Sequence, residues 1–309
     1  MISPHVSVTI DLERIRRNAA DVVARVGVPL WAVIKADAYG LGAARVAVAL
    51  AQIVEGFCVF ALEEAETIDL WASTGKPALA LGPPSTLEPQ RWLAAHVRPS
   101  VTTVEQARRL KDAGPVLCVD TGMQRFACPP EEIGPVLEAG QITEAFTHAT
   151  HVDHARRLRQ LTAGRGLKLH STATALLDEP EARLDAVRPG LALYRGAVKV
   201  RTRLAEARPS AGLIGYIGWS NEGGHHGAIL AGYSHGLRPG PVMVNGRRQR
   251  VMEVGMQSAY VTLHAEDHQG DEVILLGEGV GESDLAFVWG VTPHHALLVM
   301  ATMGEREYK

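Results

Sequence analysis

Residues 31–42, Trp31-Ala-Val-Ile-Lys35-Ala-Asp-Ala-Tyr-Gly-Leu-Gly42, organise the rest of the chain. An apolar run that ends at Ile34 meets a single lysine, and a turn containing glycine follows. Such a run is typical of a buried strand, and an amine at the end of a buried strand loses water, which favours its neutral form. A neutral lysine can condense with a carbonyl group, or the side chain can simply extend to water. The spacing alone leaves both roles open.

The segment from Val33 to Gly42 resembles the motif that anchors pyridoxal 5′-phosphate (PLP) in alanine racemases, whose usual form is V-x-K-A-N-A-Y-G-H-G. Further segments resemble motifs of the same family and occur in the family's order. They are VDTGMQR at 119–125, THAT at 147–150, VRPGLALY at 187–194, GYSHG at 232–236 and VGMQ at 254–257. Together they span nearly the whole chain, so the sequence resembles a divergent and shortened alanine racemase.

Short apolar segments alternate with helical patterns over the first two hundred residues. This alternation predicts βα units and a parallel sheet. Counting the segment that ends at Lys35, about eight strands are expected, which suggests a (β/α)8 barrel. The others lie near residues 56–61, 78–82, 98–101, 116–120, 144–148, 167–170 and 186–194.

The pattern changes from about Val198 onward. Glycines cluster there, and short segments alternate between apolar and polar residues. The pair Asn245-Gly246 between two such segments predicts a type I′ hairpin. This part of the chain is therefore expected to be built from β-strands.

The predicted fold class is α/β, with a PLP-binding (β/α)8 TIM-like barrel followed by an all-β C-terminal domain. The expected barrel domain covers residues 9–197. The expected C-terminal domain covers residues 198–309 and includes residues 1–8. A strand is predicted at residues 6–10, where apolar and polar residues alternate. The binding of PLP by the barrel is implied by the resemblance.

The bulk composition excludes several classes of partner. The formal net charge is −3, and lysines and arginines are scattered, so no nucleic-acid surface is expected. No apolar run reaches about 18 residues, and the N-terminus lacks the profile of a signal peptide. We therefore expect no membrane association and a cytoplasmic location.

The cysteines and paired histidines do not predict a metal site or a disulfide. Three cysteines are widely spaced without a C-x-x-C pair. The histidine pairs have no acidic partner at ligand spacing, and we expect them to lie in loops. The residues concerned are Cys58, Cys118, Cys128, His225, His226, His294 and His295.

The resemblance implies two groups that move the Cα proton. Lys35 would form the Schiff base with PLP and act on one face of Cα, and Tyr233 of a second subunit would act on the other. The active unit would then be a homodimer with shared sites. A phenol has an ordinary pKa near 10, so Tyr233 needs support. The resemblance assigns this support to His148, bridging towards Arg188.

The resemblance also implies the residues that bind the cofactor. Arg188 would donate to the pyridine nitrogen, where a permanent cation weakens the ring as an electron sink. Tyr39 would contact the phosphate, together with the hydroxyl of Thr174, Gly190 and the backbone N–H of Leu191, as expected for anion binding at a helix start.

The substrate carboxylate would be bound by Arg125 and by the backbone N–H of Met256 from the second subunit. Cys118 stands where many alanine racemases carry a carbamylated lysine that steadies this arginine. Other departures from the family motifs are Gln124, Ala173, His235 and Gln257.

These motifs predict a PLP-dependent amino-acid racemase that acts on alanine or another small or modified amino acid. The departures leave open a related PLP enzyme of specialised metabolism, such as a decarboxylase, an epimerase or a lyase. A PLP-binding protein without turnover is a third interpretation. Against it stands the C-terminal region that carries Tyr233, which such single-barrel proteins lack.

Overall fold

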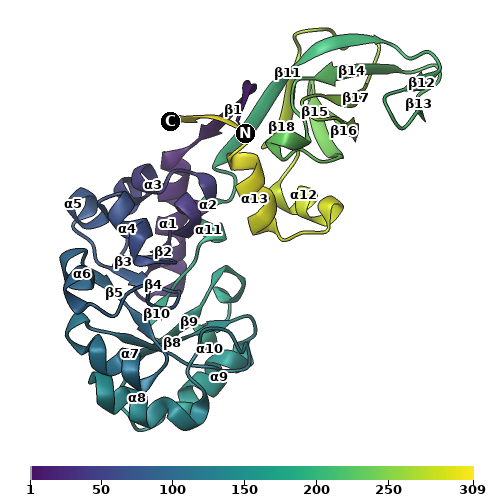
Figure 1. The fold of residues 1–309 in the computed structure, drawn as a ribbon. Helices are drawn as coiled ribbons and strands as arrows, with labels where there is room; N and C mark the ends of the chain where they lie inside the picture. Colours follow the sequence, from purple (N-terminus) through teal and green to yellow (C-terminus); the bar gives the residue numbers. More distant parts are fainter. Residues whose placement is uncertain (1) are drawn as a thin grey trace. The chain divides into compact units, whose positions relative to one another are not determined.

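The computed structural model describes residues 2–309, which form two compact units (Figure 1). We call them the α/β unit and the β unit. The α/β unit contains Glu13–Ala38 and Gly42–Arg195. The β unit contains the N-terminal residues up to Leu12, together with Tyr39–Leu41 and Gly196–Lys309.

The α/β unit contains two sheets whose strands all pair in parallel. The first has the order β2-β3-β4-β5, and the second has the order β10-β9-β8-β7-β6. Most residues of these strands are buried, as expected for parallel strands covered on both faces. The strands are β2 (Trp31–Val33), β3 (Gly56–Val59), β4 (Ala78–Ala80), β5 (Val97–Arg98), β6 (Ser100–Val101), β7 (Val116–Cys118), β8 (Glu144–Ala149), β9 (Lys168–Thr172) and β10 (Ala186–Val187).

The edges of the two parallel sheets are connected through the backbone. Pro99 alone separates β5 from β6. Next to β2, Leu30 forms a parallel bridge with Val187 of β10, and the Val187 N–H donates to the carbonyl of Pro29 at 2.9 Å. One end of the first sheet is therefore bridged to one end of the second beside β2 and β10, and at the other end the chain runs directly from β5 into β6.

Helices alternate with these strands and surround them (Figure 1). In the first helix the buried residues Ile15, Ala19, Val22 and Val26 recur every three or four positions and form one face. The helices are α1 (Leu12–Val26), α2 (Lys35–Gly40), α3 (Ala43–Leu50), α4 (Leu62–Thr67), α5 (Leu70–Thr74), α6 (Pro89–Ala94), α7 (Val104–Arg109), α8 (Ile133–Gly140), α9 (Val152–Leu161), α10 (Pro180–Arg183) and α11 (Leu191–Tyr194).

The β unit is built on one eight-stranded sheet of order β14-β17-β16-β15-β18-β11-β1-β19. The pairs are antiparallel except for β1 with β19, and β11 also pairs with β14, so the strands from β14 to β11 close on themselves. The strands are β1 (Ser3–Ile10), β11 (Val198–Pro209), β14 (His225–Ile229), β15 (Gly240–Val244), β16 (Arg247–Val254), β17 (Ala259–Leu263), β18 (Glu272–Leu276) and β19 (Gly304–Tyr308). A small hairpin, β12 (Leu213–Ile214) and β13 (Trp219–Ser220), is separate.

The Asn245-Gly246 turn confirms the predicted hairpin. Val244 of β15 pairs with Arg247 of β16. Asn245 and Gly246 have φ values of 49° and 75°, which is the left-handed pair that a type I′ turn requires.

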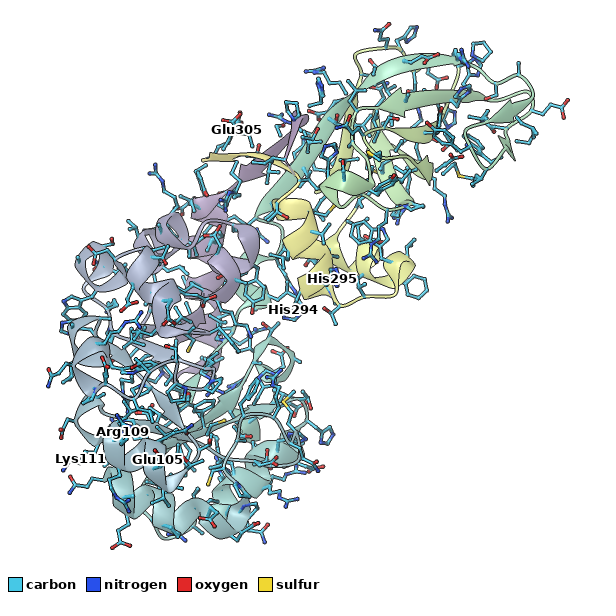
Figure 2. All side chains as sticks on the ribbon, in the orientation of Figure 1. Glu105, Arg109, Lys111, His294, His295 and Glu305 are labelled. Carbon is cyan, nitrogen blue, oxygen red and sulfur yellow. The ribbon has the colours of Figure 1, made fainter. Side chains whose placement is uncertain are left out.

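The expectation that the C-terminal region contains only β-strands is wrong. It also contains the helices α12 (Glu282–Trp289) and α13 (Pro293–Ala301). The expectation that the histidine pairs lie in loops is wrong as well. His225 and His226 are in β14, and His294 and His295 are in the first turn of α13 (Figure 2).

We predict that Leu30→Ala lowers the free energy of unfolding by about 2–5 kcal/mol, because this side chain next to β2 is only 1% exposed and its loss leaves a cavity. The same substitution at Leu93, which is 42% exposed on α6, should cost less than about 1 kcal/mol. Urea unfolding of both variants measures the difference. An equal loss of unfolding free energy in the two variants would contradict the placement of the Leu30 side chain in the core.

Candidate active site

The backbone that follows Lys35 has an unusual conformation. In α2, Ala36, Asp37, Ala38 and Tyr39 have φ values between 53° and 57°, so this short helix is left-handed. A left-handed turn costs roughly 1–2 kcal/mol for each residue with a side chain. Such strain persists only where surrounding contacts fix the backbone, and it is concentrated at functional sites.

Two carboxylates fix this strained segment. Glu64 accepts the N–H of Ala36 at 2.9 Å with one oxygen and the N–H of Phe60 at 2.6 Å with the other. Asp37 accepts the N–H of Ala43 at 2.7 Å, which ties the turn to the start of α3. The position of the Lys35 side chain is therefore set by bonds on both sides of the turn.

The Lys35 amine is biased towards its neutral form. The side chain is half-buried, and burial lowers the pKa of Lys35, as does the positive charge of Arg125. The charge of Glu64 acts in the opposite direction but does not outweigh them. A larger neutral fraction makes the amine a better nucleophile for a carbonyl group.

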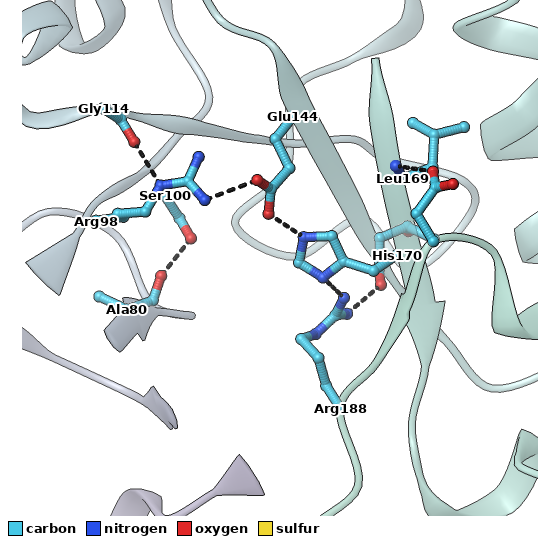
Figure 3. Close-up of polar contacts among 10 residues, drawn as sticks. Ala80, Arg98, Ser100, Gly114, Glu144, Leu169, His170 and Arg188 are labelled. Carbon is cyan, nitrogen blue, oxygen red and sulfur yellow. Dashed lines mark hydrogen bonds and ion pairs between the residues drawn. The ribbon is translucent and has the colours of Figure 1, made fainter. Parts of the chain in front are cut away.

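A chain of charged and polar groups crosses the second sheet (Figure 3). Arg188, which is buried, donates to the carbonyl of Thr147 at 2.7 Å and to Nδ1 of His170. Nε2 of His170 lies 2.9 Å from Glu144, and the other oxygen of Glu144 accepts from Arg98 at 2.7 Å. Arg188 follows β10, His170 is on β9 and Glu144 is on β8, which are neighbours in this sheet, and Arg98 is on β5 of the first sheet. The four side chains are thus linked in one line.

The order of donors fixes the protonation state of His170. A guanidinium group only donates hydrogen bonds, so Nδ1 of His170 accepts and the proton lies on Nε2, facing Glu144. Burial and the charge of Arg188 lower the pKa of His170 to about 4, which keeps the ring neutral. Burial favours a raised pKa for Glu144, but His170 and Arg98 outweigh it and hold that pKa at about 2.

His148 was expected to bridge towards Arg188, but the guanidinium is hydrogen-bonded to His170 instead. The reason is the strand register. Arg188 lies over the ring of Phe146, 4.7 Å from its centroid, and Phe146 is the residue of β8 that pairs with His170 of β9. His148 is two residues further along β8. Its pKa is lowered to about 4 by burial and by the charges of Arg188 and Arg125, so it lies in the same positive field.

Three of the residues expected to bind a phosphate, Thr174, Gly190 and Leu191, come together at the start of α11. The hydroxyl of Thr174 accepts the N–H of Ala192 at 3.1 Å, and Gly190 and Leu191 immediately precede that amide. In the same helix Tyr194, which sequence reasoning did not single out, donates from its hydroxyl to the carbonyl of Val33 at 2.7 Å. This bond ties α11 to the strand that leads to Lys35.

The loop after β7 presents Arg125. Asp120 accepts the N–H groups of Gly122 at 2.8 Å and Gln124 at 3.1 Å, which shapes the loop. Arg125 itself is exposed. Burial raises the pKa of Cys118 to about 12, so this thiol is neutral and offers no charge to hold Arg125.

In the β unit, Tyr233 begins a short 3-10 helix (Tyr233–His235), which is bonded to the loop that carries Met256. The N–H of Tyr233 donates to the carbonyl of Gly255 at 2.9 Å, and Ser234 donates its N–H and hydroxyl to the carbonyl of Met256. Tyr233 is 56% exposed and Met256 is 61% exposed. The site residues of this unit are therefore on its surface.

Two further residues of the β unit relate to these motifs. His235 accepts the N–H of Gly232 at 3.1 Å and so closes the turn that carries Tyr233. A carboxylate at this position could accept the same N–H, so the histidine can close this turn as an acidic residue would. Tyr39, which the contacts place in the β unit, has its ring 5.6 Å from that of His294.

Two kinds of feature are absent from residues 2–309. These residues contain no helix that is long and apolar enough to cross a membrane. They also contain no group of three or more histidine, cysteine or acidic side chains placed to hold a metal ion.

The fold and the site define a class of protein. A parallel α/β unit carries a lysine with a lowered pKa at the end of a strand, and a buried arginine is held nearby by the neutral ring of His170, which in turn contacts Glu144. Residues 10–198 match the family model of the alanine racemase N-terminal domain, and the chain belongs to this family.

Curated relatives cover nearly the whole chain. The sequence is 30% identical to the alanine racemase of Pseudomonas entomophila, over 92% of this chain and 94% of that protein. It is 28% identical to the catabolic alanine racemase of Pseudomonas aeruginosa, over 93% of this chain and 94% of that protein.

Solved structures of the same name share the fold. The biosynthetic alanine racemase from Pseudomonas aeruginosa gives a TM-score of 0.88 at 23% identity, covering 99% of this chain and 100% of that one. Alanine racemase from Bartonella henselae with covalently bound pyridoxal phosphate gives a TM-score of 0.86 at 21% identity, with 99% and 100% covered.

We predict that His148→Gln makes stability less dependent on pH between about 4 and 6.5. The pKa of His148 is about 4 in the folded chain and its ordinary value is 6.5, so the unfolded chain binds the additional proton in this window. Stability therefore rises with pH there and falls as the pH drops. The variant should lose part of the slope of about 1.4 kcal/mol per pH unit that one proton gives.

Urea unfolding at several pH values measures this slope. The control is His264→Gln, which changes an exposed histidine of the β unit. Identical slopes for wild type and His148→Gln would contradict the lowered pKa.

Proposed function

We propose that the protein is a PLP-dependent amino-acid racemase, an isomerase, with alanine or another small amino acid as substrate. The observation that carries this function is the half-buried Lys35 amine, whose pKa is lowered by burial and by Arg125, in a chain of the alanine racemase family. Its curated relatives are named alanine racemases, which supports alanine as the first substrate to test.

The residues present fit the three polar parts of PLP. The Lys35 amine, whose neutral fraction is raised by burial, suits its aldehyde. Arg188, a donor held in place by His170, suits the pyridine nitrogen. Thr174, Gly190 and Leu191 gather hydroxyl and backbone donors where a phosphate would lie, and we propose that Tyr39 completes the phosphate site.

When bound, PLP supplies an electron sink that makes the Cα–H bond of an amino acid acidic. Arg188 cannot give up its proton, so it leaves the pyridine nitrogen unprotonated and limits that sink. This favours return of the proton to Cα over other reactions. We propose that His148, in the same positive field, belongs to the cofactor site.

Lys35 and Tyr233 are the proposed acid–base pair at Cα. On one face, Lys35 takes the proton as the neutral amine and gives it back as the ammonium, and Tyr233 of a second subunit takes it as the phenolate and gives it as the phenol on the other. Arg125 binds the substrate carboxylate, and Met256 of the second subunit contributes its backbone N–H. Two groups on opposite faces are what inversion of a stereocentre requires.

A homodimer with shared sites follows from this assignment. Tyr233 and Met256 are exposed. The exposed ring of Tyr216 lies beside Gly255, the residue before Met256, because a β-carbon built on Gly255 would be 3.6 Å from that ring. Leu213 and Ile217 extend the exposed apolar surface. A second copy of the chain that covers this surface would bury it.

We also infer that the two parallel sheets form one closed (β/α)8 barrel. The bridge between Leu30 and Val187 and the single residue between β5 and β6 support this closure. We keep residues 9–197 as the proposed barrel domain and residues 198–309, with 1–8, as the proposed C-terminal domain.

One observation favours a second candidate function. Arg125 is exposed, and the neutral thiol of Cys118 offers it no charged partner. An arginine without that anchor can bind a different group, which fits a PLP-dependent decarboxylase, epimerase or lyase acting on a modified amino acid.

We predict that the PLP-loaded protein introduces solvent deuterium at Cα of both enantiomers of its substrate. Tyr233→Phe should lower racemisation by about 100-fold or more, because it removes one acid–base group, while visible absorbance of the bound cofactor persists. The control is Tyr260→Phe on β17. Nuclear magnetic resonance and chiral chromatography measure both reactions.

Three outcomes distinguish the candidates. Full activity in Tyr233→Phe would contradict the two-base assignment. Release of carbon dioxide from the substrate would establish the decarboxylase. Cofactor binding without deuterium exchange in a panel of amino acids would point to a binding protein.

A further inference from the structure

Glu64 connects two elements that are far apart in the sequence. It lies in the first turn of α4 (Leu62–Thr67), and its two oxygens accept different backbone N–H groups. One belongs to Ala36, directly after Lys35, at 2.9 Å, and the other belongs to Phe60, directly after β3, at 2.6 Å. A single carboxylate therefore joins the residues that follow the ends of β2 and β3.

The backbone at Ala36 needs this bond. The left-handed turn begins at this residue, and the bonds that continue it start later, from the N–H of Ala38 to Ile34 and from that of Gly42 to Asp37. The N–H of Ala36 is satisfied by Glu64 instead. Strained backbone of this kind depends on contacts from outside the turn.

Glu64 also contributes charge at the Lys35 amine. The groups that act on this amine are Arg125 in the loop after β7, Glu64 on α4 and Cys58 on β3. Burial raises the pKa of Cys58 to about 12, so this thiol is neutral at neutral pH. Glu64 is thus the anion that offsets Arg125 at Lys35.

We propose that Glu64 is the positioning residue of the cofactor lysine: its carboxylate clamps the left-handed backbone after Lys35 to the end of β3 and places a negative charge beside the amine. The proposal rests on the proposed function in that it takes Lys35 to be the group that holds PLP. It adds a residue to that function which acts through Lys35 and needs no contact with PLP or substrate.

Three substitutions in the full-length protein separate the two parts of this role. Glu64→Gln removes the charge, and its amide can accept only one of the two N–H groups with its single oxygen. Glu64→Asp keeps the charge but is one methylene shorter, so it cannot reach both amides. Glu63→Gln is the matched control, since it removes a carboxylate one residue away that pairs with Arg91 at 3.2 Å.

The first measurement is the pH midpoint for reductive methylation of Lys35, read by peptide mass spectrometry before PLP is added. It follows the pKa of the amine and does not require activity. The second is the dissociation constant for PLP, from the visible absorbance of the lysine-bound cofactor. Circular dichroism and gel filtration verify that each variant is folded.

We expect Glu64→Gln to move the methylation midpoint to lower pH and to weaken PLP binding by about 10-fold or more, since a misplaced reacting group is costly. Glu64→Asp should weaken PLP binding while its midpoint remains near that of the wild type. Glu63→Gln should change neither quantity.

The proposal is overturned if Glu64→Gln and Glu63→Gln give the same midpoint and the same dissociation constant. If Glu64→Gln does not fold, the proposal is overturned when Glu64→Asp binds PLP with the affinity of the wild type. If the wild type itself does not bind PLP, the proposed function fails, and the methylation midpoint still decides whether Glu64 acts on Lys35.

Discussion

Partial removal of water from one amine is the constraint on which the rest of this structure depends. Lys35 lies at the end of a buried strand, and both burial and Arg125 lower its pKa. The backbone that follows is held in a left-handed turn by bonds from α4 and by an acidic side chain within the turn. The fold therefore stabilises an unfavourable backbone in order to hold an amine in its reactive form.

The parallel sheet places a permanent cation near that amine without exposing it to water. Arg188, His170 and Glu144 come from strands or strand ends that are neighbours in the sheet, so residues more than forty positions apart meet in one line. The charges alternate from cation through neutral ring to anion. Each buried group has a partner, which is the condition under which buried charges are tolerated. A cofactor that contacts Arg188 therefore faces a hydrogen-bond donor that keeps its proton.

Much of this arrangement could be predicted from the sequence, because local patterns specify it. The apolar run before Lys35 and the Asn245-Gly246 turn are examples. Long-range register could not be predicted, and the bond between His170 and Arg188 is therefore absent from what the sequence predicts. The helix α13 was missed although Thr292, which caps it, and Pro293 at its first position are both start signals, because the surrounding strands dominated the pattern. The role of Glu64 depends on a contact across 28 residues that no local pattern reveals.

The most direct test of the account is to incubate the full-length protein with PLP at neutral pH, reduce it with borohydride and locate the cofactor by peptide mass spectrometry. We predict that the added mass is on the peptide containing Lys35 and not on the one containing the exposed Lys111. Attachment at another lysine, or no attachment at all, would contradict the account.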